Sequence, residues 1–300
     1  MGLLRADAEK LSNNTLVQGI VEELIDRDEL FSLLPFEQVN SKAYVYNREK
    51  TLSEADFIDP VTDTVPEGAA TFESVTETLK VLIGDVDVDN FLRETMSDTN
   101  NQFETQIAAK AKGMARKFRR TLAIGDATSN PKEFNGVAKL VTAGQTITAG
   151  TNGAALTLSM LDELLDAVPY GADVIMMRAG TLRAHRALLR SLGGTSVDNV
   201  VQGEYGPIPA HNGVPIIVND FLPADEVQGN SSACCSIYAM RLNVADGLHG
   251  LYGGPELGIR IEDVGLVQNK DARRTRLKWY CGIALKSTKS LARIKGITNI

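Results

Sequence analysis

Three histidines and three cysteines are the residues of this sequence best suited to acid–base, nucleophilic or metal chemistry. A catalytic histidine needs a nucleophile or a carboxylate beside it, and a zinc site needs ligands at short, regular spacings. His185, His211 and His249 have no such neighbours in the sequence. Cys234 and Cys235 would point to opposite faces of a strand, so they cannot share one ion and are typical of small core residues. The sequence therefore predicts no catalytic site, no cofactor and no metal site.

Motifs of the common enzyme classes are also missing. The sequence contains no G-x-S-x-G turn, no G-x-G-x-x-G, no phosphate-binding loop and no H-E-x-x-H. We therefore predict a protein that is not an enzyme and that acts through its surfaces. An α/β enzyme acting through His211 or His249 is the alternative from a different functional class.

Composition places the chain among ordinary soluble globular proteins. It has 300 residues, of which 43% are hydrophobic and 23% charged, enough for two or three compact units. The net charge of −7 disfavours a protein whose entire surface binds nucleic acid. Any contact with DNA is therefore predicted to be weak and non-specific. No apolar run approaches the roughly 20 residues that span a bilayer, and no signal peptide pattern is present. These features predict folding in the cytosol and no membrane partner.

Near the N-terminus the pattern predicts a helix followed by a long two-stranded arm. Apolar residues at helical spacing predict an amphipathic helix over 14–34, and β-rich runs from residue 41 and over 71–83 predict two strands. The connection, residues 51–70, carries two prolines and five acids. So long a connection without structure of its own is uncommon in a compact domain. It is either a mobile surface loop or a protruding arm that orders against a neighbouring subunit.

Charged residues of the arm are the candidate subunit interface. A two-stranded ribbon is marginal by itself in water, so this arm needs a partner surface. Charges near its tip can fix the register of a repeated contact. The predicted interface residues are Arg48, Glu49, Lys50, Glu54, Asp56 and Asp59.

The strongest periodic pattern predicts one long helix over residues 97–122. Its apolar stripe consists of Phe103, Ile107, Ala111, Met114, Phe118 and Leu122. Six basic residues lie toward the end of this segment, an order that complements the helix dipole. In so acidic a chain they favour a solvated or subunit-facing surface over specific DNA recognition.

The second half of the chain alternates between strand and helix patterns. The Asn135-Gly136 pair predicts a turn into a β-hairpin over 137–148, and Ser159 with Asp162 predicts the start of a helix. A further helix is predicted over 181–192. Strands are predicted over 172–177, 214–218, 234–242, 258–265 and 276–285. This alternation predicts a compact α/β domain over 155–260.

Three segments together resemble the Hong-Kong-97-type capsid fold, which major capsid proteins of tailed bacteriophages share with encapsulins. FNGVAKL, residues 134–140, resembles the segment after the family's long spine helix. NGVPIIVNDFLP, residues 212–223, resembles the axial-domain strand, and GGPELGIRIED, residues 253–263, is similar to the return to the peripheral domain. The chain departs from the family at 287–289, where Ser-Thr-Lys stands in place of a frequent Pro-Ala and puts the register of the final strand in doubt.

This resemblance implies an α+β, Hong-Kong-97-type capsid fold in four parts. They are an N-terminal arm (1–40), an extended β-hairpin loop (41–83), a peripheral domain with the spine helix (84–154 and 261–300) and an axial α/β domain (155–260). The implied function is that of a structural subunit that assembles, as hexamers and pentamers, into the icosahedral head shell around the double-stranded DNA of a tailed phage. Because encapsulins share the fold, the shell of a protein nanocompartment is the alternative function.

Partners and location follow from the same resemblance. Some family members join a loop-tip lysine covalently to a neighbour's asparagine. Lys50 is the comparable residue here, and non-covalent assembly is expected because no partner asparagine can be identified. The extended loop begins by residue 41, which leaves no room for a large fused scaffold and predicts a separate scaffolding protein, with a portal as a further partner. The expected location is the virion, after assembly in the host bacterial cytoplasm.

Overall fold

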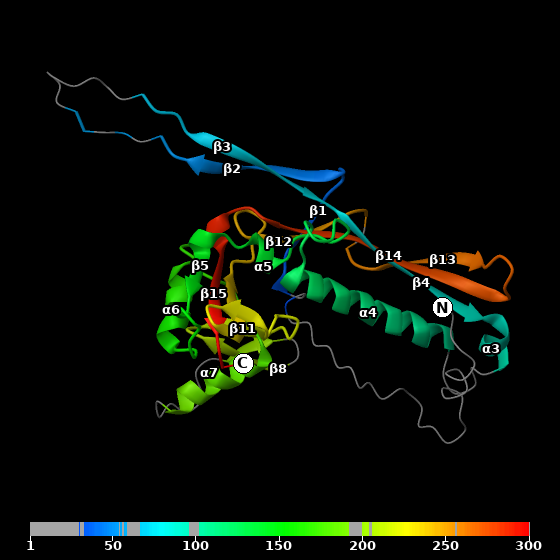
Figure 1. Cartoon of the computed structure of the whole chain (residues 1–300). Coiled ribbons are helices and arrows are strands. Elements are labelled where there is room, and N and C mark those ends of the chain that lie inside the picture. The colour runs from blue at the N-terminus through cyan, green and yellow to red at the C-terminus, as the bar shows by residue number, and fades with distance from the viewer. Residues whose placement is uncertain are drawn as a thin grey trace.

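Two β-sheets with helices packed on them form the body of the molecule, and a thin two-stranded ribbon projects from it (Figure 1). The structure, a computed structural model, describes residues 30, 33–53, 55, 57–58, 67–95, 102–191, 200–203, 206–255 and 257–299. We call the two sheets peripheral and axial, after the domains that the sequence predicts.

Strand β14 is the centre of the peripheral sheet. It pairs with β4 along one edge and with β13 and then β12 along the other, while β1 pairs in parallel with β12. The strands are β1 (Phe36–Gln38), β4 (Lys80–Asp89), β12 (Leu248–Tyr252), β13 (Arg260–Leu266) and β14 (Ala272–Leu285). Along β14 the buried side chains of Leu277, Trp279 and Cys281 alternate with the outward Arg276 and Lys278. This alternation, with a period of two, gives the sheet one apolar face.

The long helix α4 (Gln102–Ile124) covers that apolar face, as Figure 1 shows. The ring of Phe118 lies 4.5 Å from that of Trp279, and Met114 and Leu122 are buried beside it. Phe103, Ile107 and Ala111 pack against the same core. The predicted helix and its apolar stripe are therefore confirmed over the described residues, and a short helix α3 (Asn90–Thr95) precedes it.

Sheet order in the axial sheet is β5-β15-β11-β6-β9-β8-β7, with β10 on β11. The strands are β5 (Thr146–Thr148), β6 (Val174–Met177), β7 (Val200–Gly203), β8 (Gly206–His211), β9 (Val214–Val218), β10 (Glu226–Gln228), β11 (Ser231–Met240) and β15 (Leu291–Ile297). Helices α6 (Leu158–Asp166) and α7 (Ala179–Ser191) pack on one face, against residues such as Ile237. The next residue, Tyr238, points to the other face and joins the core of α4. The two bodies therefore share a continuous core.

Beyond the body, strands β2 (Ala43–Thr51) and β3 (Thr71–Thr78) pair antiparallel as the ribbon. Both predicted strands are confirmed, although the second breaks at Leu79, where the chain leaves the ribbon and enters β4. The predicted helix over 14–34 lies outside the described residues except at its end. There Leu30 and Leu34 are buried, and the Leu34 amide donates to the Leu30 carbonyl at 2.9 Å.

The predicted hairpin over 137–148 is wrong. Its place is taken by the short helix α5 (Val137–Leu140), the 3-10 turn η1 (Ala143–Gln145) and β5. The reason is a tertiary contact, because the Gly136 amide donates to the Gly125 carbonyl at the end of α4. A Cβ atom on Gly136 would lie 2.5 Å from the Thr121 carbonyl oxygen. Gly136 therefore permits close packing on α4 and does not form a hairpin turn.

Smaller differences concern helix starts and the last strand. Thr157, and not Ser159, caps α6, since its hydroxyl accepts from the Met160 amide at 3.3 Å. Residues 287–289, where the sequence departs from the family pattern, lie at the 3-10 turn η2 (Thr288–Ser290). After this turn β15 lies in the axial sheet, although residues 261–300 were assigned to the peripheral domain. Strand β12 lies in the peripheral sheet, although residues 155–260 were assigned to the axial domain. The division into 1–40, 41–83, 84–154 with 261–300, and 155–260 stays a prediction.

The contact between α4 and β14 yields the first testable prediction. Phe118→Ala removes a ring that is 2% exposed and is expected to lower the free energy of unfolding by about 3–5 kcal/mol, because a cavity replaces it. Urea denaturation followed by circular dichroism measures the change. Phe91→Ala is the control, since Phe91 is 60% exposed on α3 and its loss is expected to matter by about 0.5 kcal/mol or less. Equal effects of the two changes would contradict this account of the core.

Candidate assembly interface

The base of the ribbon is fixed by its own subunit. Tyr44, Tyr46 and Arg48 alternate along β2 and point to the body. The Tyr46 hydroxyl donates to the Leu285 carbonyl at 2.7 Å, and the Arg48 guanidinium donates to the Lys286 and Leu285 carbonyls at 2.8 and 2.7 Å. Since those carbonyls end β14, the ribbon is attached to the central strand of the peripheral sheet.

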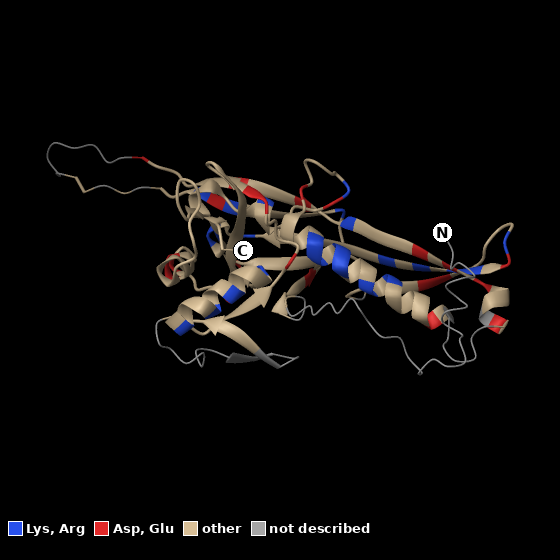
Figure 2. Ribbon diagram, turned by 60° about the horizontal axis from the view of Figure 1, so that its bottom comes forward, with Lys and Arg blue, Asp and Glu red and all other residues tan. Residues whose placement is uncertain are grey.

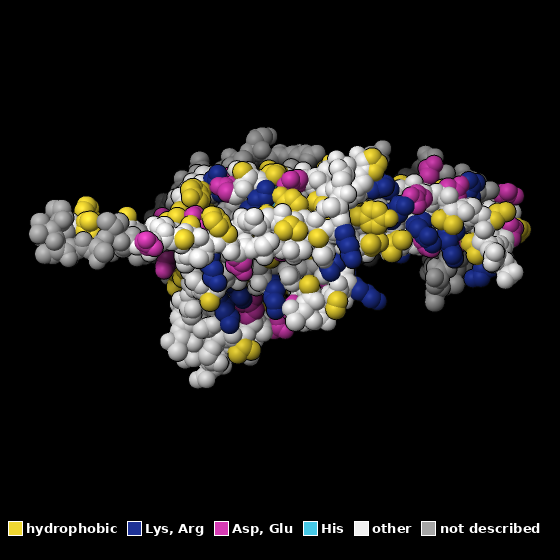
Figure 3. Space-filling model, turned by 90° about the horizontal axis from the view of Figure 1, so that it is seen from above, with side chains coloured by type: hydrophobic (Ala, Val, Ile, Leu, Met, Phe, Trp, Pro, Cys, Tyr) yellow, Lys and Arg dark blue, Asp and Glu magenta, His cyan; other side chains and the backbone are white. Residues whose placement is uncertain are grey.

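The other face of the ribbon and the segment beyond it expose apolar side chains. Val45 and Phe72 are 58% and 68% exposed on the two strands, and Leu52 and Phe57 are still more exposed beyond β2. Hydrophobic side chains also lie at the surface of the projecting segment and along the body in Figure 3. Apolar surface gathered on one element in this way is typical of an interaction site. One face of the ribbon therefore packs on the body of its own subunit. The other face is not covered by any described residue of that subunit.

The structure places half of the predicted interface residues. Arg48, Glu49 and Lys50 lie on β2 itself, so they belong to the ribbon wall and not to its tip. Arg48 is engaged within the subunit, whereas Glu49 and Lys50 are exposed. The other three predicted residues lie outside the described residues: Glu54, Asp56 and Asp59. Their role at a subunit interface stays a prediction for the whole set.

A buried cluster at the base of the ribbon was missed by the sequence analysis. His249 of β12 is fully buried, and its Nε2 lies 3.5 Å from a Glu37 carboxylate oxygen, which also accepts from the Tyr44 hydroxyl at 2.7 Å. Lys286 lies over the Tyr44 ring at 5.5 Å. Burial lowers the pKa of His249, while burial and the Glu37 carboxylate raise the pKa of Tyr44. Alternation in AYVYNR was the one sequence signal, because it places Tyr44 and Tyr46 on the same face.

The other two histidines also lie together. The rings of His185 on α7 and His211 on β8 meet edge to face at 5.5 Å, and His211 Nε2 lies 2.9 Å from the Asp162 carboxylate. His185 is buried, neither of its ring nitrogens has a hydrogen-bond partner among the described residues, and burial lowers its pKa. His211 and His249, which have no carboxylate at a suitable spacing in the sequence, therefore each lie near one in the folded chain. Even so, within the described chain no group of three or more His, Cys, Asp or Glu residues is arranged to hold a metal ion.

Carboxylates on β4 neutralise arginines of β14. Arg276 forms two hydrogen bonds with Asp85 at 2.8 and 2.9 Å, and Arg274 forms two with Asp87 at 2.6 and 2.7 Å. These bonds lower the pKa of both carboxyl groups. Further pairs join Arg273 to Asp263 of β13 and Lys278 to Glu262. This basic cluster is therefore internally paired and does not form the unpaired cationic surface that nucleic acid requires.

Several bases of α4 also have partners. Arg119 donates to the Val218 carbonyl at 2.5 Å, Arg116 lies over the Phe221 ring at 5.4 Å, and Lys117 pairs with Glu133 at 2.5 Å. Figure 2 shows the run of Lys and Arg along this helix. Arg116 and Arg119 therefore hold α4 to the axial side of the molecule, and Lys117 holds it to the loop 130–134. These contacts lie within the subunit, whereas the sequence favoured a solvated or subunit-facing surface.

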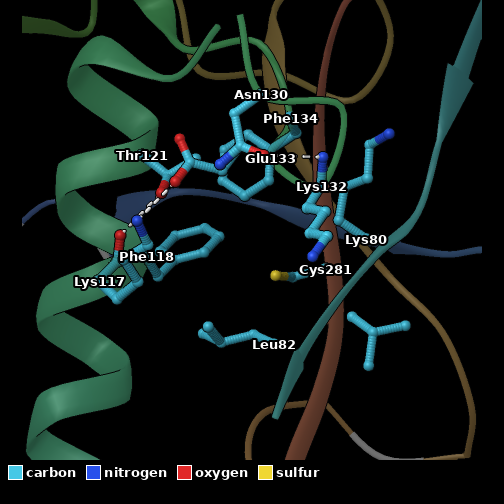
Figure 4. A pocket seen from close by; sticks show the side chains of 11 residues that line it. Lys80, Leu82, Lys117, Phe118, Thr121, Asn130, Lys132, Glu133, Phe134 and Cys281 are labelled. Atoms are coloured by element: carbon cyan, nitrogen blue, oxygen red, sulfur yellow. Dashed lines mark hydrogen bonds and ion pairs between the residues drawn. The ribbon is translucent and has the colours of Figure 1, made fainter. Parts of the chain in front are cut away.

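A pocket of about 260 Å³ opens where α4 ends, between Lys80–Leu82 of β4 and the loop 130–134 (Figure 4). Its floor is apolar, formed by Phe118, Phe134 and Leu82 among others, and its rim carries three lysines. Such a shape offers apolar contact with a cationic border, which suits binding.

Comparison with known proteins decides the family. The sequence matches the family described as the SU10 major capsid protein over residues 36–298, which is most of the chain. The chain belongs to this family. Among curated proteins there is no significant match.

Solved structures show that this major capsid protein has the Hong-Kong-97-type fold. The SrpI encapsulin of Synechococcus elongatus PCC 7942 superposes with a TM-score of 0.74 at 20% identity, covering 99% of this chain and 97% of that one. The capsid of an empty GTA particle gives 0.72 at 15% identity, with 97% of each chain covered. The capsid of Cyanophage A-1(L) gives 0.67 at 15% identity, covering 96% and 98%. The predicted α+β capsid fold is confirmed.

Family and fold together assign the molecule a structural role. As a major capsid protein it is a component of a capsid shell and associates with copies of itself, which places it in the virion. The described helices include none with the length and apolar character that crossing a membrane demands. The prediction of a capsid protein is confirmed at this level.

His249 gives a pH-dependent prediction for the base of the ribbon. Because burial holds its pKa below the usual value of about 6.5, the unfolded chain binds a proton that the folded protein rejects. Its contribution to stability is present above about pH 6.5 and is lost as the pH falls. We expect His249→Gln to remove part of the fall in unfolding free energy between about pH 7 and pH 5, a range above that of ordinary carboxyl groups. The rest of the fall belongs to His185, whose pKa burial also lowers.

Urea denaturation of wild type and variant at several pH values measures this dependence. His211→Gln is the matched control, because His211 also lies beside a carboxylate but belongs to the axial sheet. If His249→Gln keeps the wild-type pH dependence and His211→Gln removes it, the pH dependence belongs to His211 and the assignment to His249 is wrong.

Proposed function

We propose that this capsid protein assembles, as hexamers and pentamers, into the closed icosahedral head shell that encloses the double-stranded DNA of a tailed phage. The observation that carries the proposal is the ribbon β2–β3, which is attached to its own body by Tyr46 and Arg48 and exposes Val45 and Phe72 on its other face. A rigid base with an uncovered apolar face suits a contact that every subunit makes with a neighbour. Membership in a major capsid protein family supports the same conclusion.

Partners of this shell form part of the proposal. A separate scaffolding protein and a portal would take part in assembly, which would occur in the host bacterial cytoplasm. Contact between subunits is non-covalent, and contact with packaged DNA is weak. Internal pairing of Arg274 and Arg276 with carboxylates supports the last point, since it removes cations from any DNA-facing surface.

A nanocompartment shell is the second candidate function. The observation in its favour is the TM-score of 0.74 to an encapsulin over nearly the whole of both chains. The two functions differ in content, because a phage head holds DNA and a compartment holds a protein cargo. Negative-stain microscopy of the purified protein tests for closed shells in general. Neighbouring genes distinguish the two, since terminase and portal genes favour the phage head and a cargo-enzyme gene favours the compartment.

Replacing residues 51–70 by a short Gly-Ser turn is expected to block closed shells while both sheets stay folded. Among the described residues, none of this segment belongs to the cores of the peripheral and axial sheets, so the body should keep its thermal melting transition. Circular dichroism reports the fold, and sedimentation with electron microscopy reports assembly. Normal shells from this variant would show that the segment is an ordinary surface loop. A globally unfolded subunit would show that it belongs to the core.

Binding of DNA to the isolated subunit is expected to be weak, salt-sensitive and independent of sequence. Dissociation constants near or above about 1 μM at physiological salt are typical of non-specific binding. Fluorescence anisotropy with duplexes of equal length and different sequence, at several salt concentrations, measures it. Tight binding to one sequence that survives high salt would contradict the proposed shell and favour a DNA-recognition protein.

A further inference from the structure

The pocket at the end of α4 has the dimensions of a side chain. Its volume of about 260 Å³ lies below the roughly 300–1,000 Å³ of typical small-molecule sites. Phe118 and Phe134 in its floor are nearly fully buried, with their rings 5.5 Å apart. An aromatic side chain is the occupant that such an apolar floor accepts best, because aromatic rings stack edge to face or offset on one another.

The positive charge on the rim of the pocket favours a partner with acidic side chains. Lys80, Lys117 and Lys132 line the pocket with one acid, Glu133, so the rim has three positive charges and one negative, a net charge of +2. Lys117 is paired with Glu133, and Lys80 donates to the Pro131 carbonyl at 2.8 Å, an uncharged acceptor. The whole chain, in contrast, carries −7. A segment that brings an aromatic residue between carboxylates would complement this pocket.

The chain contains one such segment at the end of its ribbon. Residues 51–70 hold five acids, a single aromatic residue, Phe57, and no Lys or Arg. Asp56 and Asp59 stand beside Phe57 in the sequence, and the Phe57 side chain is fully exposed. A fully exposed ring flanked by acids matches the apolar floor and the cationic rim together.

A subunit cannot fill its own pocket in this way. Lys80 of the pocket directly follows the ribbon, whereas Phe57 lies beyond the opposite end of β2. At about 3.3 Å per residue the nine residues of β2 separate the two ends by about 30 Å. Figure 1 shows the ribbon leading away from α4 along its whole length. The occupant must therefore come from another copy.

We propose that Phe57 of one subunit inserts into the pocket at the end of α4 of a neighbouring copy, with the carboxylates around it facing Lys80 and Lys132. This inference rests on the proposed self-assembly and names the contact by which the arm engages its neighbour. Phe57 supplies the apolar anchor, and the surrounding acids fix its orientation. The pocket is thus a subunit interface and has no small-molecule ligand.

A disulfide between engineered cysteines tests the geometry. Val81 lines the pocket and is 58% exposed, and Ile58, next to Phe57, is 39% exposed. Ile58→Cys with Val81→Cys in one chain keeps the Phe57 anchor and brings two thiols together only if the arm of a neighbour docks there. Oxidised glutathione accepts the two electrons. The three native cysteines are buried, and Cys281, which lines the pocket, is replaced by Ala in both variants so that it cannot compete for the new thiol. Assembled shells of the double variant are expected to shift from a monomer band to a ladder of multimers on a non-reducing gel.

Ile58→Cys with Val264→Cys is the matched control, because Val264 is 49% exposed on β13, across β14 from the pocket. It is expected to stay monomeric on the gel. Shells that form without a ladder in the Ile58→Cys, Val81→Cys variant, or with an equal ladder in the control, would overturn the docking and leave self-assembly intact. Wild-type protein that forms no shells would instead overturn the proposed function.

Charge exchange provides the second test. Lys80→Glu with Lys132→Glu is expected to abolish shells while circular dichroism stays unchanged, and adding Asp56→Lys with Asp59→Lys to the same chain is expected to restore them. Lys270→Glu with Lys289→Glu is the control, since both lysines are exposed and outside the pocket and the net charge changes equally. Normal shells from the pocket variant, or loss that the added lysines do not rescue, would overturn the proposed contact.

Discussion

Strand β14 is the constraint on which the rest of the subunit depends. It pairs with β4, β13 and β12, presents Trp279 to α4, and ends in the two carbonyls that receive Tyr46 and Arg48 of the ribbon. One strand therefore sets the position of the long helix, the sheet and the projecting arm. Because its backbone hydrogen bonds are shared with three partners, a shift in its register would move every buried side chain to the wrong face. The direction of the arm is in this way coupled to the core.

Many of the basic side chains in this molecule are paired with carboxylates or with backbone carbonyls, and they do not form one large basic patch. The arginines of β14 face carboxylates of β4 and β13, and much of the charge on α4 is directed to the axial body. An exposed ion pair such as Arg273–Asp263 contributes only about 0–1 kcal/mol. The bonds from Arg274 to Asp87 and from Arg276 to Asp85 are bidentate and partly buried, the geometry in which an ion pair contributes more. Their consequence is a peripheral surface without a large cationic field. The pocket rim, with its net positive charge, is a local exception within an acidic chain.

The elements that could be predicted from the sequence are those whose apolar residues repeat with the period of a helix or a strand. The stripe of α4 and the alternation of β14 repeat at the periods of a helix and a strand, so both elements were predictable. Gly136 was misinterpreted because its role is set by the Thr121 and Gly125 backbone and not by its neighbours in sequence. His249, Glu37 and Tyr44 come from three separate strands, so no spacing could reveal their cluster. Of the predicted interface residues, the structure describes those on β2, which are Arg48, Glu49 and Lys50.

Attachment of the ribbon at its base changes the energetics of assembly. A free two-stranded arm would lose conformational entropy on docking, and that loss opposes association. Here Tyr46 and Arg48 already fix the base through hydrogen bonds to the end of β14, so much of this loss occurs when the subunit folds. The segment beyond β2 brings apolar and acidic side chains to the proposed contact. In the proposed shell, individually weak contacts are then sufficient, because a closed symmetric assembly repeats each of them at every equivalent subunit. The arm would meet its neighbour in a direction that the core has set.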